Sequence, residues 1–130
     1  MSSKSKSTDS LKDHLSRYRE IKITVTGRKS GRSISIPVWF VFADDKLYLL
    51  PVKGSDTQWY KNVLHNPKMR ISARGKEGAF QATPISDSMV VQPVVEAFRV
   101  KYGAGDVKKY YSKFDVAVRI DLSPAQPMIG

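Results

Sequence analysis

Apolar and polar residues alternate along much of this chain, and the period of the alternation predicts its elements. Residues 21–26 alternate strictly, which is typical of a strand with one buried face. A second strand is expected over 33–43, a segment rich in β-branched and aromatic residues. A third is expected over 47–52, after a tight turn at Asp44-Asp45. The three strands are predicted to form a meander.

The middle of the chain predicts a short helix followed by a hairpin. Residues 58–65 are long enough for two helical turns, and Asn66-Pro67 closes them. Strands are then expected over 69–73 and 79–85, on either side of the polar connection 75–78. These two strands are expected to pair with each other.

The last third predicts a helical pair and one more strand. Ser86 or Asp87 is a suitable cap for a helix in which Pro93 must lie near the start or mark a second beginning. A shorter helix is expected around 107–111, and 114–122 has the alternation of a final strand. Six strands with short flanking helices predict a mainly β (α+β) fold. A barrel is favoured over an open sheet, because closure removes exposed edges.

The length of 130 residues fits one domain with one core. We expect a disordered polar leader over 1–9, a folded domain over 10–124 and a tail over 125–130. The domain is expected to begin with a short helix capped by Ser10. No segment has the apolar run of a secretory signal or of a membrane span, so a cytoplasmic protein without a transmembrane segment is the expectation.

Composition narrows the chemistry further. The chain has no cysteine, which excludes disulfide scaffolds, cysteine-ligated metal centres and thiol catalysis. No HExxH or GxSxG motif is present, and no metal site is predicted. With 22 Lys and Arg against 12 Asp and Glu, the net charge of +10 favours a polyanionic partner: nucleic acid, an anionic membrane surface or a phosphorylated ligand.

The segment 27–32, with the sequence GRKSGR, is the sharpest candidate for an anion site. Its glycines allow close approach of the backbone, and Arg28, Lys29 and Arg32 can form charge-assisted hydrogen bonds to phosphate oxygens. Ser30 can donate another. The segment is not a Walker A loop, because the spacing differs and a strand follows it. The alternative interpretation is a solvated, positively charged hairpin.

Two aromatic groups are further candidates. Trp59 and Asn62 lie three residues apart and share a helix face, so an aromatic plane and an amide could address one side of a planar ring. Taken alone, Trp59 is more simply a core residue. Tyr102, Tyr110 and Tyr111 form the second group, from which a phenol could donate a proton or stack on a substrate. Adjacent tyrosines on a short helix usually mean that one is buried and one exposed.

Several of these segments, taken together, carry a family resemblance. They are Thr24–Arg32, Ile36-Pro37, Lys53–Ser55, Trp59–Asn62 and Asn66-Pro67. In this order they resemble the deazaflavin-dependent nitroreductase family over residues 21–85. Members of that family are split β-barrels related to FMN-binding and pyridoxamine-phosphate-oxidase-like proteins. The resemblance therefore implies a split β-barrel of about six antiparallel strands.

The resemblance also implies a cofactor and a reaction. Family members use reduced coenzyme F-420 (8-hydroxy-5-deazaflavin) to reduce nitro compounds, quinones or similar small acceptors, and a tyrosine in the position of Tyr110 or Tyr111 helps to protonate the product. The residues implied for cofactor binding are Arg28, Lys29, Ser30 and Arg32 at the phosphate. At the ring they are Pro37, Val38, Trp39, the segment 51–54 with Lys53 and Gly54, Trp59 and Asn62. FMN is the alternative cofactor, and a homodimer is implied.

The sequence leaves a second class of function open. A relative on the same barrel could be a non-catalytic carrier of a flavin or tetrapyrrole. A small nucleic-acid-binding barrel could instead use the charge of +10 together with surface aromatics. The aromatics of residues 39–48 lie within apolar runs, which predicts burial. The oxidoreductase is therefore favoured, with no specific nucleic-acid partner.

Overall fold

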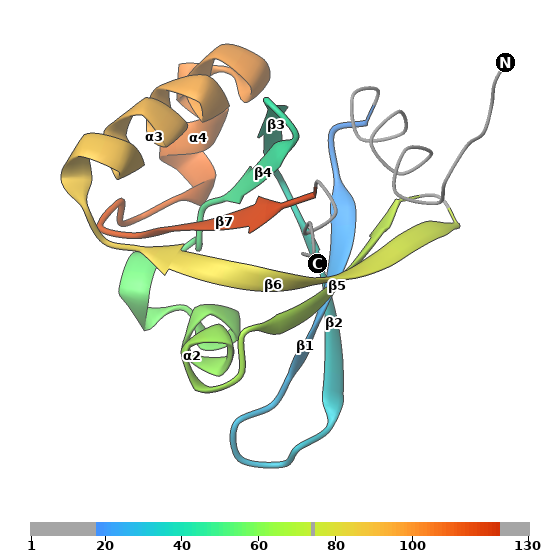
Figure 1. Cartoon of the computed structure of the whole chain (residues 1–130). Coiled ribbons are helices and arrows are strands. Elements are labelled where there is room, and N and C mark those ends of the chain that lie inside the picture. Colours follow the sequence, from blue (N-terminus) through green and yellow to red (C-terminus); the bar gives the residue numbers. More distant parts are fainter. Residues whose placement is uncertain (1–17, 74, 123–130) are drawn as a thin grey trace, which may run out of the picture.

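Seven antiparallel strands and three α-helices make up the described part of the chain, residues 18–73 and 75–122 of a computed structural model (Figure 1). The strands are β1 (Ile21–Thr26), β2 (Ser33–Val38), β3 (Val41–Ala43), β4 (Lys46–Leu49), β5 (Lys68–Ala73), β6 (Lys76–Ile85) and β7 (Ala117–Asp121). The helices are the 3-10 turn η1 (Gly54–Asp56), then α2 (Gln58–His65), α3 (Ser88–Tyr102) and α4 (Ala104–Tyr110). The expected leader, the helix at Ser10 and the tail lie outside the described residues.

The strands form one curled sheet in the order β2-β1-β5-β6-β7-β4-β3. Its two edge strands, β2 and β3, are consecutive in the chain and are separated only by Trp39 and Phe40. The sheet must therefore curl until the end of one edge meets the start of the other (Figure 1). The predicted barrel-like β fold is confirmed.

The prediction of one strand over 33–43 was wrong, and so was the simple meander. Phe40 is fully buried inside the barrel, and the chain bends there instead of continuing as a strand. The Phe40 backbone N–H donates to the Tyr102 hydroxyl at 3.0 Å, and the Phe40 carbonyl accepts from Lys101 Nζ at 2.9 Å. Side chains at the end of α3 thus form the hydrogen bonds that the N–H and carbonyl groups of Phe40 would form with a neighbouring strand in a regular sheet.

Other boundaries differ by a few residues. β6 begins at Lys76, because it pairs with β5 up to Ala73, whereas the sequence predicted a start at 79. The strand predicted over 47–52 ends at Leu49, and the one predicted over 114–122 is the shorter β7. α3 runs unbroken through Pro93, in its second turn, since buried residues further along the helix hold it against the sheet.

The predicted short elements are otherwise present. α2 spans the predicted residues, and the β5–β6 hairpin forms. The Asp87 side chain caps α3 by accepting from the Met89 N–H at 2.9 Å. Asp44 and Asp45 both have positive φ, at 55° and 62°, which is the conformation of a tight hairpin turn. Within the described residues, no helix is both long and apolar enough to cross a membrane.

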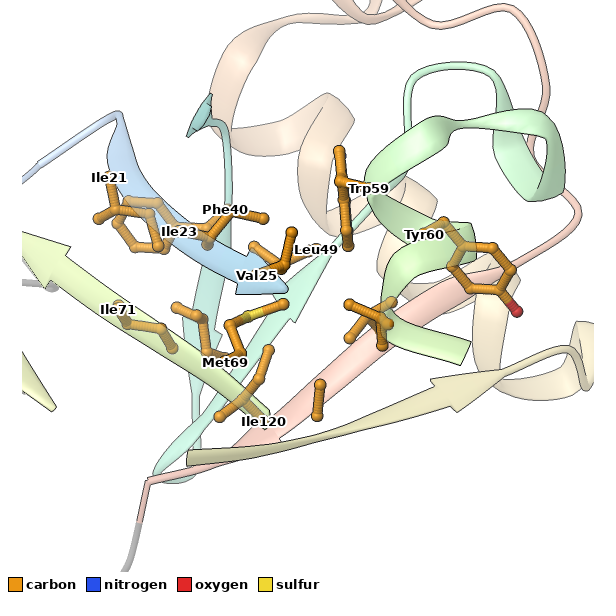
Figure 2. Packing of buried hydrophobic residues seen from close by; sticks show 14 of the residues in the cluster. Ile21, Ile23, Val25, Phe40, Leu49, Trp59, Tyr60, Met69, Ile71 and Ile120 are labelled. Carbon is orange, nitrogen blue, oxygen red and sulfur yellow. The ribbon is translucent and has the colours of Figure 1, made fainter. Parts of the chain in front are cut away.

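Two apolar clusters hold the fold together. The first fills the barrel and includes Ile23, Phe40 and Trp59 (Figure 2). The second lies between the sheet and the helices α3 and α4, which run side by side in Figure 1. Ala117 belongs to the outer cluster and Val118 to the inner one, because successive residues of a strand face opposite sides.

Candidate functional site

A pocket of about 370 Å³ opens where the end of β2, the loop after β4, the start of α2 and the end of α4 come together. We call it the aromatic pocket. Two tryptophans and two tyrosines are among its walls, and the remaining lining is mostly aliphatic. The lining residues are Glu20, Ile36, Pro37, Val38, Trp39, Leu50, Val52, Thr57, Trp59, Tyr110 and Tyr111.

Trp39 is the centre of the aromatic contacts. Its ring stacks on Tyr102, with centroids 4.3 Å apart and an interplanar angle of 7°. The Tyr110 ring meets it edge-on at 5.6 Å, and Tyr111 lies tilted at 6.0 Å. Tyr102 is itself anchored, because its hydroxyl lies 2.6 Å from the Arg19 carbonyl oxygen. The indole is therefore held in a defined orientation in the pocket wall.

The two tyrosines of α4 and its end differ in exposure. Tyr110 is 51% exposed, whereas Tyr111 is 6% exposed, as the sequence interpretation of adjacent tyrosines anticipated. Burial raises the pKa of the Tyr111 phenol well above its usual range, and the nearby Tyr102 adds to this. The Tyr111 hydroxyl forms no hydrogen bond with any residue of 18–73 or 75–122. It is thus a protonated donor that lacks an acceptor among those residues.

The Gly27–Arg32 segment is the turn between β1 and β2. The Gly27 N–H donates to the Arg32 carbonyl at 2.8 Å, and the Gly31 N–H donates to the Gly27 carbonyl at 2.9 Å, which closes the loop. Gly31 has a φ of +72°, a conformation that favours glycine. Lys29, Ser30 and Arg32 are exposed at the tip.

Arg28 fixes this loop to α2. Its backbone N–H donates to Asn62 Oδ1 at 3.1 Å, and its Nη1 donates to the same oxygen at 2.7 Å. Its Nη2 donates to Gln58 Oε1 at 2.8 Å. Both partners are neutral amides, and no carboxylate of the described residues forms an ion pair with Arg28, Lys29 or Arg32. The loop is held in place while its positive charge stays unneutralised.

The loop and the aromatic pocket are joined by β2 and by α2. Pro37 follows Arg32 by five residues of extended chain, a span of about 17 Å at the usual rise of a strand. On α2, Asn62 faces the loop and Trp59 lines the pocket. A ligand with an anionic group at one end and a planar ring at the other could contact both.

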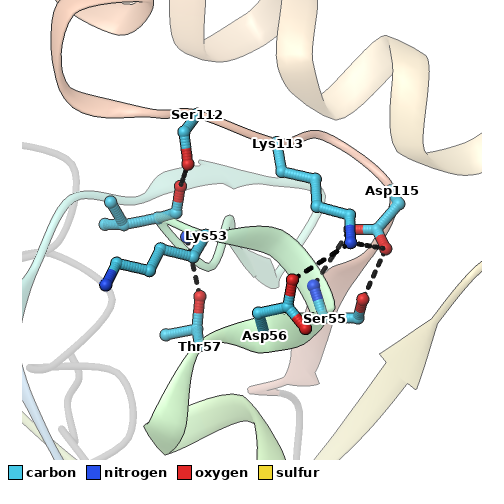
Figure 3. Close-up of polar contacts among 8 residues, drawn as sticks. Lys53, Ser55, Asp56, Thr57, Ser112, Lys113 and Asp115 are labelled. Atoms are coloured by element: carbon cyan, nitrogen blue, oxygen red, sulfur yellow. Dashed lines mark hydrogen bonds and ion pairs between the residues drawn. The ribbon is translucent and has the colours of Figure 1, made fainter.

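A polar network fixes the wall of the aromatic pocket that the loop after β4 forms (Figure 3). Asp115 accepts from the Ser55 N–H at 2.9 Å and from the Ser55 hydroxyl at 2.6 Å. Although desolvation opposes ionisation, these hydrogen bonds lower the pKa of Asp115. The Ser112 N–H donates to the Val52 carbonyl at 2.9 Å, so the residue after Tyr111 is tied to the loop after β4. The tyrosines therefore sit against a fixed loop.

The structure brings together much, but not all, of what the sequence predicted as a site. Lys53 is exposed, and neither it nor Gly54 lines the pocket. Gly54 is buried against Asp115 instead: a Cβ at this position would lie 2.1 Å from Asp115 Oδ1. Asn62 contacts the loop and does not line the pocket with Trp59.

Several lining residues were not predicted as site residues. Glu20 is the charged residue among those that line the pocket, and Thr57 and Leu50 contribute to the wall. Their positions follow from how β1, β4 and α2 meet, which no local pattern reveals. For Asp115, the one available signal was an acidic residue within an otherwise apolar strand run.

A family model described as "Uncharacterized protein conserved in bacteria (DUF2255)" matches residues 12–119. Among curated proteins, no match was found.

Three similar solved structures have barrels of this type. An F-420-H2 dependent reductase (FDR-A) is 20% identical, with a TM-score of 0.60, over 78% of this chain and 93% of that one. HutZ, a heme storage protein from Vibrio cholerae, is 15% identical, with a TM-score of 0.66, over 91% and 89%. A NimC/NimA family protein from Clostridium acetobutylicum is 16% identical, with a TM-score of 0.62, over 89% and 82%. At these identities the similarity establishes the fold, a split β-barrel.

Proposed function

The chain belongs to the DUF2255 family, and we propose that it is a reductase that binds a phosphorylated flavin-type cofactor, coenzyme F-420 or FMN, and reduces a small organic acceptor at the aromatic pocket. One observation carries the proposal. The residues that the sequence implied for contact with the cofactor ring and for proton donation line one pocket, and β2 connects this pocket to a loop whose positive charge is not neutralised. These residues are Pro37, Val38, Trp39, Trp59, Tyr110 and Tyr111.

The loop would hold the phosphate. Lys29 and Arg32 are exposed at its tip, and Ser30 can donate from its hydroxyl. Arg28 adds a charge that its hydrogen bonds to α2 hold in place. Charge-assisted hydrogen bonds of this kind each contribute about 1.5–3 kcal/mol. Ser30 Oγ now accepts from the Arg32 N–H at 3.1 Å, an arrangement that leaves its own proton free for a phosphate oxygen.

The pocket would hold the ring. Its volume of about 370 Å³ falls in the range of roughly 300–1,000 Å³ that is usual for small-molecule sites. Trp39, fixed by stacking on Tyr102, offers a rigid aromatic surface, and Pro37 and Val38 add apolar contacts. Both cofactors carry a planar ring and a phosphate joined by a flexible chain.

A bound cofactor of this class supplies the hydride. The chain's own residues orient the acceptor, exclude water and provide a proton. Tyr111 fits the last role better than Tyr110, because its hydroxyl is buried in the pocket wall and has no acceptor among the described residues. Tyr110 is half exposed and fits a contact at the mouth of the pocket.

Titration of the purified protein with FMN and with coenzyme F-420, followed by tryptophan fluorescence, tests the proposal. We expect saturation by one of them at or below tens of micromolar, which is roughly 6 kcal/mol of binding free energy. Lys29→Ala and Arg32→Ala should each weaken binding, by about 1–3 kcal/mol. Lys76→Ala, an exposed lysine on β6, is the matched control and should leave affinity unchanged.

A second candidate is a non-catalytic carrier, since one of the similar structures is a heme storage protein. Reduction of menadione or a nitroarene by the loaded protein separates the two. Saturable binding without turnover would favour the carrier. Failure of a folded sample to bind either cofactor would remove the cofactor site altogether.

A further inference from the structure

A second cavity, of about 790 Å³, lies between α3 and the β3–β4 hairpin. We call it the α3 groove. It shares no lining residue with the aromatic pocket. Its walls are apolar apart from the side chains of Asp44 and Lys101 and the phenol of Tyr48. The volume is in the range of roughly 300–1,000 Å³ that is usual for small-molecule sites.

One face of α3 forms the long wall of the groove. Apolar residues recur there at helical spacing: Met89, Val90, Pro93, Val94, Ala97 and Val100. Met89 is 81% exposed and Val100 is 86% exposed, although both are large apolar side chains. A continuous apolar surface of this kind is typical of a ligand or partner site.

Lys101 adds a positive charge to the wall. Its Nζ donates to the Phe40 carbonyl at 2.9 Å and lies 3.6 Å from the centroid of the Phe40 ring. An ammonium group has three protons to donate, and the described residues accept one of them. Desolvation, and then the charge of Arg19, lower the pKa of Lys101 to about 8.

No carboxylate neutralises this charge within residues 18–73 and 75–122. Lys101 forms no ion pair there, and Arg19 contributes a second cation through its hydrogen bond to the Lys101 carbonyl. A negative group in the groove would give the ammonium its missing acceptors, and would relieve the repulsion between the two cations.

We propose that the α3 groove binds an apolar molecule with a single carboxylate, such as a medium-chain fatty acid, whose head pairs with the Lys101 ammonium and whose chain lies along α3. Asp44, in the β3–β4 turn, also lines the groove. Its negative charge disfavours a second anionic group on the ligand. The ligand is therefore a monocarboxylate and not a diacid.

Calorimetric titration of the full chain with laurate, kept below its micellar concentration, tests this site. We expect saturable binding to one site per chain. Dodecyltrimethylammonium has an apolar chain of similar length and the opposite charge, and it should bind at least tenfold more weakly. Equal binding of the two amphiphiles would contradict the assignment of the head group.

Variants at position 101 separate charge from packing. Lys101→Met keeps an apolar stem but loses the charge, and it should weaken laurate binding about tenfold or more. Lys101→Arg keeps the cation and should retain affinity to within a few fold. Lys108→Met, an exposed lysine on α4 outside the groove, is the control. Unchanged laurate affinity in folded Lys101→Met would overturn the proposal.

The competing occupant is a second copy of this chain. Light scattering of the same samples, with and without Met89→Glu, measures that possibility. If the wild type is a dimer that Met89→Glu dissociates, and laurate neither binds nor dissociates it, the groove is an interface and the proposal fails. Because the aromatic pocket is separate, this outcome leaves the proposed cofactor site untouched.

Discussion

The aromatic pocket and the α3 groove lie on two sides of one bend in the chain, and their chemistry differs sharply. Trp39 lines the pocket, Phe40 fills the barrel, and Val41 lines the groove. Tryptophans, tyrosines and Glu20 give the pocket flat surfaces, a phenol donor and a negative charge. The groove has mostly aliphatic walls, and its charged side chains are Lys101 and Asp44.

Trp39 and Val41 both pack in the outer cluster, as alternate residues of a strand would, and Phe40 belongs to the inner one. Trp39 and Val41 nevertheless line different cavities, on either side of the break between β2 and β3. The bend gives them separate sites, and Tyr102 at the end of α3 contacts the bend and the Trp39 ring together. The difference between the two cavities therefore depends on how well α3 holds Phe40.

The largest effect is expected from Tyr111→Phe, which acts on the pocket alone. If the buried phenol donates the proton, turnover at saturating cofactor should fall by about 10²–10⁴-fold, with cofactor affinity unchanged. Since the hydroxyl has no partner among the described residues, thermal stability should not drop. Steady-state kinetics and a melting curve measure both. Tyr110→Phe is the matched control, and a larger loss there would reverse the assignment.

Gly54→Ala should lower the free energy of unfolding by about 2–4 kcal/mol, because it disturbs the wall of the aromatic pocket. The α3 groove should stay intact. The φ of Gly54 is +56°, and a Cβ would lie 2.1 Å from Asp115 Oδ1, so Asp115 must give up its place beside Ser55. Gly31→Ala is the control: φ is +72° but nothing lies within 4 Å of the added Cβ, so only backbone strain remains. Urea unfolding compares the two. Equal losses would mean that the Asp115 contact adds nothing.

Tyr102→Phe should weaken both sites together, because it removes the acceptor of the buried Phe40 N–H. We expect a loss of about 1–3 kcal/mol in unfolding free energy. The Tyr48 hydroxyl makes no hydrogen bond to the described residues, so Tyr48→Phe should be nearly neutral. Denaturant unfolding, with laurate and flavin titrations of each variant, tests the coupling. A Tyr102→Phe protein that loses only one ligand would show that the cavities are independent.

The smallest expected effect is a pH dependence at Lys101. Burial, and then the charge of Arg19, lower the pKa of Lys101 in the folded protein to about 8, against 10.5 for a freely exposed lysine. Between these values the unfolded state binds more protons, so stability should rise as pH increases from about 8 to 10.5, by about 1–2 kcal/mol. The rise should disappear in Lys101→Met. Unfolding curves across this pH range measure the stability of the wild type and of Lys101→Met. If stability changed with pH equally in both proteins, the lowered pKa of Lys101 would be contradicted.

Local patterns predicted what depends on local chemistry. The β1–β2 turn, α2, the β5–β6 hairpin and the Asp87 cap follow from residue types at short spacing, and all are present. The sheet order does not, because it depends on which distant strands meet. The bend at Phe40 lies inside an apolar run that looks like one strand, and only its contacts with α3 reveal why it breaks.

In the candidate site, too, local patterns predicted some residues correctly and failed for those whose place depends on distant contacts. Trp59, Tyr110 and Tyr111 could be proposed from residue type, and they line one pocket. Asn62 was assigned to the ring because it shares a helix face with Trp59, but a face is wide enough for one residue to contact the loop and the other the pocket. Gly54 was assigned from a short motif, whereas its position is explained by Asp115, sixty-one residues later.

The edges of the sheet also limit how this protein can meet another chain. β3 has three residues, and β2 carries Pro37, which has no N–H to donate. Edges that are short or interrupted by proline resist the addition of a further strand, and so resist amyloid-like stacking. We therefore expect a partner of this domain to be recognised through its side chains and not by pairing with an edge strand.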